Sequence, residues 1–318
     1  MALGEFDLIQ KYFTPPSIRT DVALGVGDDC AIVSIPPGKQ LAVSTDTLVE
    51  AVHFPSSTAP EDIAYKAVAV NLSDLAAMGA TPAWLTLALS LPGVDLDWIK
   101  AFSATFIATA GHYNVQLIGG DITRGPLSIT VQAMGLIEPA HCMRRDGARP
   151  GDLIYVSGTL GDAAMGLRIW QQGQFGDRNA AWLIDRLKRP QPRVKLGIEV
   201  AAYCKCAIDI SDGLVADLGH ILAASQCGAT VYTGKIPLSD QLVEHANNRN
   251  AVDWELVLTG GDDYELCLVV PAANESKLLS VASELSLPIA RIGIIEQHQS
   301  LSIIDRAGTK LLLDHSGY

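Results

Sequence analysis

Cysteine is scarce in this chain, and the six cysteines are not spaced as a disulfide framework. No C-x-x-C pair occurs, and Cys204 and Cys206 stand alone where a structural zinc ion would need four ligands. Free thiols without a pairing pattern are typical of a reducing compartment. The sequence therefore predicts a protein of the reducing cytosol.

Long apolar runs and excess basic charge are also missing. No run approaches the ~20 residues of a membrane span, and Met1 to Glu5 lack the basic start and apolar stretch of a signal peptide. The net charge of −12 disfavours nucleic acid and anionic membranes as main partners. We expect a soluble, cytoplasmic protein with no nucleic-acid or membrane partner.

The length of 318 residues and the 48% hydrophobic content allow a substantial core and favour two domains. Strand-like apolar runs alternate with helix-like segments, a pattern typical of an α/β (α+β) fold. The stretch from Arg144 to Asp152 is polar and rich in Gly and Pro, which favours a domain boundary. We expect an N-terminal domain over 1–146 and a C-terminal domain over 147–318.

Several elements near the N-terminus can be predicted from local patterns. The segment 60–79 opens with proline and acids, is apolar on nearly all sides and ends at a glycine, so it should be a buried helix. The runs 31–35 and 41–45 flank a Pro-Pro-Gly turn and are expected to form a hairpin. The strands at 41–45 and 127–137 are expected to leave apolar edges that need covering.

The most informative pattern is a set of turns that each deliver a carboxylate. The strand 41–45 ends on Asp46, beside Ser44 and Thr45, and ligands of α/β proteins bind at strand ends. The arrangement recurs at 27–29, 117–121, 207–213 and 258–263. Asp74 lies inside the predicted helix, where a buried, unpaired carboxylate would cost several kcal/mol. Asp74 should therefore have a cation or hydrogen-bond donors beside it.

Converging carboxylates would need cations. Two of them ~4 Å apart repel by about 4 kcal/mol at an effective dielectric of 20. Oxygen ligands without His or Cys favour Mg²⁺ or Ca²⁺. Because Mg²⁺ completes its coordination with water and phosphate oxygens, several ions shared with a polyphosphate would support phosphoryl transfer.

Other interpretations of these residues remain open at this point. The acidic turns could be unrelated strand ends, where Asp and Gly are common. A structural Ca²⁺ module would show a twelve-residue loop with a terminal Glu, which is absent. His53 could be a packed loop residue, and Gly119-Gly120 an ordinary turn. The segment 157–162 suits an anion at a helix start, but it lacks the G-K-[ST] of a P-loop.

Six stretches, taken together and in order, resemble the thiamine-monophosphate kinase family, and the likeness extends over almost the whole chain. They are Gly25–Ala31 (GVGDDCA), Ser44–Leu48 (STDTL), Asn71–Ala80 (NLSDLAAMGA), Gly119–Gly125 (GGDITRG), Asp209–Leu214 (DISDGL) and Gly260–Leu266 (GGDDYEL). The resemblance implies the two-domain fold shared with aminoimidazole ribonucleotide synthetase and selenophosphate synthetase. In that fold the N-terminal sheet pairs in a dimer barrel, and the C-terminal domain covers the nucleotide.

The same resemblance implies an activity and a site. A homodimer would use ATP and several Mg²⁺ ions to convert thiamine phosphate to thiamine diphosphate by direct in-line transfer. The catalytic residues would be Asp46, Asp74 and Asp209. The Mg²⁺ ligands would be Asp29, Ser44, Thr45, Asp46, Asp74, Asp121, Asp209 and Asp212. ATP would be contacted by Tyr113, Gly120, Asp121, Arg145 and Ser211. Thiamine phosphate would be contacted by His53, Asp262 and Tyr318.

The chain departs from the family pattern at two positions. Asp262 stands where the family usually has Glu, so its side chain is one methylene shorter, and the chain ends at Tyr318, where relatives usually continue. Two other functions are open. One is a synthetase that phosphorylates an amide or carbonyl oxygen, or selenide; a selenophosphate synthetase would need a reactive cysteine in a Gly-rich N-terminal loop, and none of the six cysteines lies in one. The other is a regulator that binds ATP or thiamine without turnover.

Overall fold

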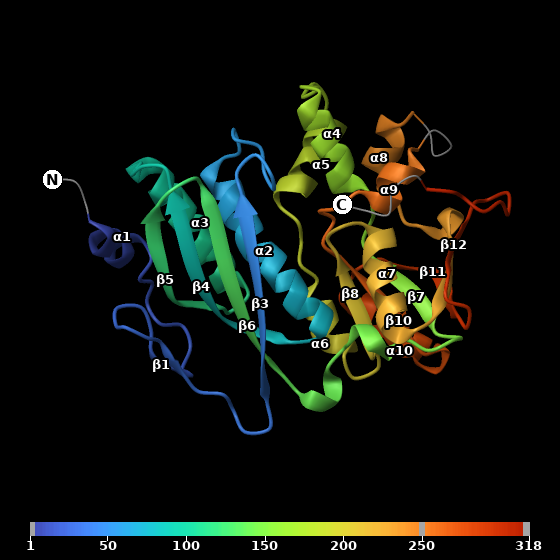
Figure 1. Cartoon of the computed structure of the whole chain (residues 1–318), viewed down its shortest axis with the longest axis horizontal. Coiled ribbons are helices and arrows are strands. Elements are labelled where there is room, and N and C mark those ends of the chain that lie inside the picture. Colours follow the sequence, from blue (N-terminus) through green and yellow to red (C-terminus); the bar gives the residue numbers. More distant parts are fainter. Residues whose placement is uncertain (1–3, 248–251, 314–318) are drawn as a thin grey trace. The chain divides into compact units, whose positions relative to one another are not determined.

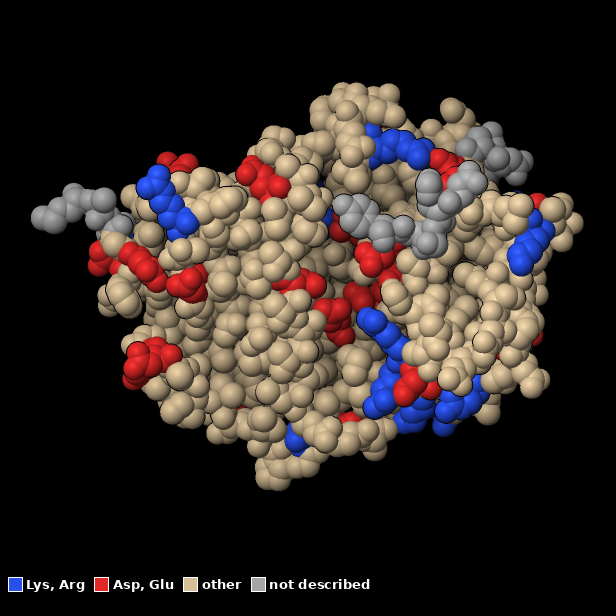
Figure 2. All heavy atoms as spheres, viewed as in Figure 1, with Lys and Arg blue, Asp and Glu red and all other residues tan. Residues whose placement is uncertain are grey.

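The computed structural model describes residues 4–247 and 252–313, and the chain divides into two compact units (Figure 1). Unit 1 consists of Met1–Leu75 and Ala80–Pro139, and unit 2 consists of Ala76–Gly79 and Ala140–Tyr318. Acidic side chains are spread over both units on the face shown in Figure 2, as the net charge predicts. No helix among the described residues is long and apolar enough to cross a membrane.

Unit 1 contains a four-stranded sheet of order β3-β6-β4-β5. The strands are β3 (Gln40–Val49), β6 (Ser128–Ile137), β4 (Thr81–Leu91) and β5 (Gln116–Arg124). β6 is antiparallel to both β3 and β4, whereas β4 and β5 are parallel. β3 and β5 are therefore the edge strands of this sheet, and the expectation of a free edge at 127–137 is wrong because β6 is paired on both sides.

The predicted hairpin of 31–35 with 41–45 is also wrong. β2 (Ile32–Val33) pairs with β1 (Val22–Leu24) in a separate two-stranded sheet. β3 instead pairs with β6 over ten residues, from Gln40 opposite Ile137 to Val49 opposite Ser128. The Pro-Pro-Gly turn reverses the chain, but β3 forms many more backbone hydrogen bonds along the ten residues of β6 than it could form with the two residues of β2.

The helices of unit 1 pack on one face of its sheet (Figure 1). They are α2 (Pro60–Met78) and α3 (Leu96–His112), while α1 (Glu5–Tyr12) lies near β5. α2 is buried along most of its length, which confirms the prediction for 60–79. Asp95 caps α3 by accepting hydrogen bonds from the backbone N–H groups of Asp97 and Trp98.

Unit 2 contains a six-stranded sheet of order β12-β9-β11-β7-β10-β8. Its neighbouring strands are antiparallel except for β12 and β9. The strands are β7 (Leu153–Ser157), β8 (Cys206–Ile210), β9 (Gly228–Tyr232), β10 (Glu265–Val270), β11 (Ile289–Glu296) and β12 (Leu301–Ile304). Buried side chains from this sheet, among them Ile154, Ile208 and Val269, form the core of the unit.

Seven helices of unit 2 are described. They are α4 (Asp162–Gln171), α5 (Arg178–Lys188), α6 (Val194–Val200), α7 (Leu214–Ser225), α8 (Asp240–His245), α9 (Trp254–Thr259) and α10 (Glu275–Glu284). Short 3-10 turns occur at η1 (Pro139–His141), η2 (Arg145–Gly147), η3 (Thr233–Lys235) and η5 (Ala272–Asn274). α7 follows β8 directly, so the Asp209–Gly213 motif spans a strand end and a helix start.

Candidate active site

The candidate site of unit 1 is built where β3 faces α2. Successive side chains of a strand point to opposite faces, so Ser44, Asp46 and Leu48 share the face on which Leu48 is buried. Ser44 Oγ donates a hydrogen bond to Asp74 Oδ2 on α2. The structure thus supplies the donor that a half-buried Asp74 was expected to need.

Asn71 lies one turn before Asp74 and fixes the strand beside it. Its Oδ1 accepts a hydrogen bond from the backbone N–H of Asp46 at 3.2 Å, and its Nδ2 donates to Ala67 O at 3.0 Å. The buried amide of Asn71 therefore fixes the backbone of Asp46 relative to α2. The neighbourhood of Ser44, Asp46 and Asp74 follows from the strand period of two and the helical spacing of three.

Thr45 and Thr47 point to the other face of β3. Thr45 Oγ1 accepts a 3.4 Å hydrogen bond from Gln132 Nε2, and the Thr47 and Thr130 hydroxyls are 2.8 Å apart. The structure consequently does not bring the Thr45 hydroxyl together with Ser44 and Asp46.

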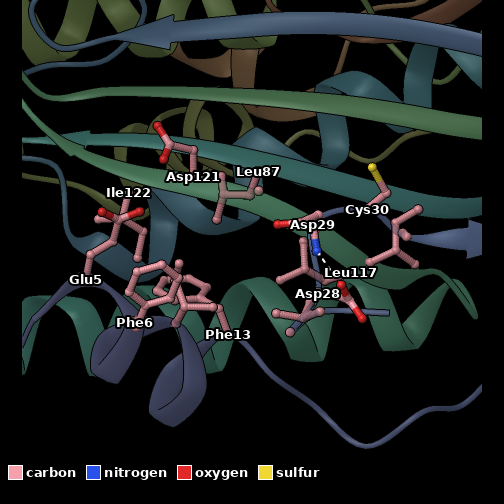
Figure 3. A pocket seen from close by; sticks show the side chains of 17 residues that line it. Glu5, Phe6, Phe13, Asp28, Asp29, Cys30, Leu87, Leu117, Asp121 and Ile122 are labelled. Atoms are coloured by element: carbon pink, nitrogen blue, oxygen red, sulfur yellow. Dashed lines mark hydrogen bonds between the residues drawn. The ribbon is translucent and has the colours of Figure 1, made fainter. Parts of the chain in front are cut away.

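Asp29 and Asp121, two other predicted metal ligands, line one pocket of unit 1 with a volume of about 390 Å³. Figure 3 shows it lying between α1 with its C-cap residue, which contribute Phe6 and Phe13, and the strands that carry Leu87 and Asp121. Asp29 is exposed, and its backbone N–H donates to Asp28 Oδ1 at 2.8 Å. Acidic side chains thus occur at both ends of the pocket, with Glu5 beside Phe6 at one end and Asp28 and Asp29 at the other.

Gly120 occupies this pocket for a structural reason. A Cβ at this position would lie 1.9 Å from the backbone oxygen of Leu87 on the neighbouring strand. No other residue fits there, so the sheet itself requires glycine. Its backbone also lines the pocket, which leaves room for a ligand. Tyr113, the other predicted ATP contact of unit 1, ends α3 with its ring edge-on to His112 and does not line the pocket.

His53 lies in an exposed turn directly after β3. Its Nδ1 accepts a hydrogen bond from the backbone N–H of Val49 at 3.0 Å. With Nδ1 as an acceptor, Nε2 is the ring nitrogen placed to donate. The turn presents this nitrogen to solvent, so His53 is not a packed core histidine.

The candidate site of unit 2 begins at the end of β8, where Asp209 is buried and Ser211 and Asp212 emerge. The backbone N–H groups of Ser211 and Asp212 both donate to Asp217 Oδ2, at 2.9 and 3.0 Å. Burial raises the pKa of Asp217 to about 6, with the charge of Asp212 adding to the rise and that of Arg145 opposing it. Arg145 is thereby placed near this loop, with its own side chain exposed.

The turn Gly260–Tyr264 packs directly on the same loop. The backbone N–H groups of Asp262 and Tyr264 donate to the oxygens of Ser211 and Ile210, both at 2.8 Å. Asp262 has a φ of 71°, in the left-handed region that Asp tolerates better than most residues. The structure thus brings Asp262 next to Ser211. Tyr318, the third predicted contact of thiamine phosphate, lies outside the described residues.

A buried ionic network beside this turn was missed by sequence reasoning. Glu265 is 0% exposed and accepts hydrogen bonds from Ser157 Oγ at 2.6 Å, Arg193 Nε at 2.6 Å and Arg186 Nη2 at 3.1 Å. Its neighbour Asp263 accepts from the backbone N–H of Gly161 at 2.6 Å, at the start of α4. A Glu as the first residue of the otherwise apolar strand β10 was the signal that could have indicated such a network.

Burial has a marked effect on the acids of this network. It raises the pKa of Asp263 to about 8, and the charge of Asp162 raises it further, against the stabilising backbone N–H groups of Gly161 and Ala163. Burial also raises the pKa of Asp162. Both acids hold loops in place, since Asp162 accepts from the hydroxyls of Thr159 and Ser239.

The predicted Mg²⁺ ligands are divided between the units. Unit 1 carries Asp29, Ser44, Thr45, Asp46, Asp74 and Asp121, and unit 2 carries Asp209 and Asp212. Over 4–247 and 252–313, no group of three or more His, Cys, Asp or Glu side chains is gathered closely enough to hold a metal ion by itself. Any ion would therefore need hydroxyl, carbonyl, water or phosphate oxygens in addition.

Comparison with known proteins defines the class first. Residues 27–137 match the family "AIR synthase related protein, N-terminal domain", and residues 149–306 match "AIR synthase related protein, C-terminal domain". The two matches account for both units and establish the two-domain AIR synthase-related fold. Six free thiols, all within the described residues, accompany this fold.

Individual relatives then narrow the family. The chain is 48% identical over 321 residues to the thiamine-monophosphate kinase of Escherichia coli (strain K12), covering 100% of this chain and 98% of that protein. The crystal structure of the thiamine-monophosphate kinase of Stenotrophomonas maltophilia K279a is 48% identical, with a TM-score of 0.85 over 90% of this chain and 92% of that one. The structure of AaThiL complexed with AMPPCP and TMP is 30% identical, with a TM-score of 0.78 over 100% and 98%. The chain belongs to the thiamine-monophosphate kinase family.

Proposed function

We propose that this protein transfers the terminal phosphoryl group of ATP to the phosphate of thiamine phosphate, giving ADP and thiamine diphosphate. The observation that carries the proposal is the full-length 48% identity to a thiamine-monophosphate kinase. The complex of AaThiL with AMPPCP, an ATP analogue, and TMP supports both substrates. The free thiols and the lack of a membrane-spanning helix among the described residues support a cytoplasmic location.

The donor set supports Mg²⁺ as the cofactor. Ser44, Asp46 and Asp74 gather hard oxygen atoms on one face of β3, without nitrogen or sulfur ligands. When bound, Mg²⁺ would neutralise the charge between donor and acceptor phosphates. We assign the ions to Asp29, Ser44, Asp46, Asp74, Asp121, Asp209 and Asp212, and not to the Thr45 side chain, which points to the other face of β3.

The chain's own residues bind and orient the two substrates. Tyr113, Gly120, Arg145 and Ser211 are the proposed ATP contacts, and His53, Asp262 and Tyr318 those of thiamine phosphate. His53 would donate Nε2–H to the acceptor phosphate, because its Nδ1 already accepts from Val49. In the transfer step an acceptor phosphate oxygen bonds to the γ-phosphorus while the bond from that phosphorus to the β-bridging oxygen breaks.

The step requires no general base. The second pKa of a phosphate monoester is ~6, so the acceptor is largely dianionic at neutral pH and carries no proton to remove. Asp46, Asp74 and Asp209 act by positioning and charge, which supply most of the catalysis in phosphoryl transfer. The transfer is direct, with no phosphorylated form of the enzyme.

The choice of acceptor tests this mechanism. With Mg-ATP, we expect thiamine phosphate to be phosphorylated and unphosphorylated thiamine to react at less than about one hundredth of that rate. Thiamine lacks the attacking oxygen and the charge that orients it, and its hydroxyl would need a base. A coupled ADP assay at equal acceptor concentrations measures both rates. Comparable rates would contradict the direct mechanism, and no ADP release with either acceptor would favour a non-catalytic binding protein.

We also propose that the protein is a homodimer. β3 is an edge strand of the unit 1 sheet, and Val43 on its outer face is 52% exposed. Such an edge with apolar residues invites pairing with a second copy. Light scattering should give the mass of two 33.8 kDa chains at micromolar concentration. Val43→Lys should weaken the dimer, whereas Val94→Lys, at an equally exposed site outside the sheet, should not. A monomer mass for the parent protein would rule out this interface.

A further inference from the structure

The loop from Asp209 to Gly213 is held on both sides by backbone hydrogen bonds. On one side, Asp217 Oδ2 accepts from the N–H groups of Ser211 and Asp212 at 2.9 and 3.0 Å. On the other side, the oxygen of Ser211 accepts from the N–H of Asp262 at 2.8 Å. Both peptide groups of Ser211 are therefore fixed in direction, and with them the direction in which its side chain leaves the loop.

The buried side chain of Asp217 fixes the conformation of this loop. It lies in the first turn of α7, is only 3% exposed and reaches back past the helix start to the loop that precedes it. Gly213, which precedes α7, has no side chain with which to cap the helix. Burying a carboxylate is costly unless it is hydrogen-bonded, and here the two loop N–H groups provide that compensation.

The geometry explains what the loop would lose without this carboxylate. The N–H groups of Ser211 and Asp212 would lack an acceptor, and a rotated peptide would relieve them at the expense of the side-chain directions. The loop also packs tightly against the neighbouring segment 259–261. A Cβ on Gly261 would lie 2.2 Å from the oxygen of Ser211, and one on Gly213 would lie 2.6 Å from the backbone carbon of Thr259. Loop and turn thus pack backbone to backbone.

We propose that Asp217 is the positioning residue for the Mg-nucleotide in unit 2, acting through the two loop peptides that carry Ser211 and Asp212. The inference rests on the proposed function, in which Ser211 contacts ATP and Asp212 binds Mg²⁺. Asp217 itself touches neither. Its carboxylate sets where the Ser211 hydroxyl and the Asp212 carboxylate stand before the nucleotide arrives, so that their ordering is not required on binding.

Steady-state kinetics of Asp217→Asn test this role. We expect the KM for Mg-ATP to rise by about tenfold. Losing a hydrogen bond to a charged group typically weakens binding by about this factor. The KM for thiamine phosphate should stay within about threefold of the parent value, because Asp263, the residue after Asp262, is held by the backbone N–H groups of Gly161 and Ala163 and not by the Ser211 loop. A residue that served stability alone would lower the melting temperature and leave both KM values unchanged.

Asp152→Asn is the matched control. Asp152 is another partly buried acid of unit 2 that accepts a backbone N–H, from Arg149 at 2.9 Å, away from the Ser211 loop. This variant should retain the parent KM for Mg-ATP even where its melting temperature falls. If Asp152→Asn raised that KM as much as Asp217→Asn does, the assigned positioning role would be wrong.

Nucleotide binding provides a readout that is independent of turnover. Calorimetric titration with AMPPCP and Mg²⁺ should show about tenfold weaker binding for Asp217→Asn and a larger loss for Asp217→Ala, which removes the acceptor altogether. Asp217→Glu, which retains a charged acceptor, should recover part of the affinity and serves if the other variants do not fold. Equal affinity in parent and folded variants would overturn the inference. A parent that binds Mg-AMPPCP but never phosphorylates thiamine phosphate would instead contradict the proposed function and leave this comparison of affinities valid.

Discussion

We expect Asp46→Asn to lower kcat for thiamine phosphate by on the order of 10³-fold, because a single contact to a catalytic metal ion is worth several kcal/mol. Asp46 shares the inner face of β3 with Ser44, which is hydrogen-bonded to Asp74. Asparagine has nearly the same shape but carries no charge, so it would bind Mg²⁺ poorly. Steady-state rates at saturating Mg-ATP measure the loss.

The fold should survive this substitution. β3 is held to β6 by backbone pairing, and the contact of Asn71 with residue 46 uses the backbone N–H, which the change leaves in place. Asp97→Asn, at an exposed position of the first turn of α3, is the matched control and should retain parent activity. A kcat for Asp46→Asn within about threefold of the parent value would exclude a role in metal binding.

The second large effect is on stability. Glu265→Ala should lower the free energy of unfolding of unit 2 by about 3–5 kcal/mol, because it leaves the guanidinium groups of Arg186 and Arg193 buried without their shared carboxylate. The side chains of these arginines are only 10% and 15% exposed. For a unit of this size, the expected fall in melting temperature is about 10 °C. Calorimetry of the full chain measures it.

An ion pair on the surface serves as a control that separates the effect of burial on stability from the effect of losing a charge. Asp146 pairs with Arg144 at 2.8 Å, but both side chains are largely exposed, so Asp146→Ala should leave the melting temperature close to that of the parent protein. Glu265→Gln, which keeps the acceptor oxygen and the volume, should fall between Glu265→Ala and the parent. If Glu265→Ala melted like Asp146→Ala, the network would be unimportant for stability.

The parts of the site that could be predicted from the sequence depend only on the alternation of side chains along a strand or the repeat of residues along a helix. Asp74, the acid on a buried helix, follows from local patterning, and the structure supplies its donor from Ser44. The predicted strand end at Asp46 is wrong, because β3 continues to Val49 and Asp46 lies inside the strand. The alternation of β3 also determines that Thr45 points away. Each of these relations needs only the residues of one strand or one helix.

The relations that sequence could not predict depend on distant partners. The turn at Pro36-Pro37-Gly38 indicated a hairpin, but nothing local shows that β3 pairs with residues 128–137 instead. An acid in the first turn of a helix, like Asp217, is common for electrostatic reasons, so its two bonds to the preceding loop are not distinctive in sequence. Glu265 meets Arg186 and Arg193 from 72 or more positions away.

The ten-residue register of β3 with β6 makes the composition of the site a matter of odd and even positions. A deletion or insertion of one residue within β3 would exchange the two faces, turning the Ser44 and Asp46 side chains outward and the threonines inward. No single substitution could restore the arrangement. Evolution can therefore alter this strand residue by residue, but changes in chain length must be absorbed outside it, for example in the turn formed by 36–38. The backbone hydrogen bonds between β3 and β6 thus also prevent a shift of register that would turn the catalytic side chains to the wrong face.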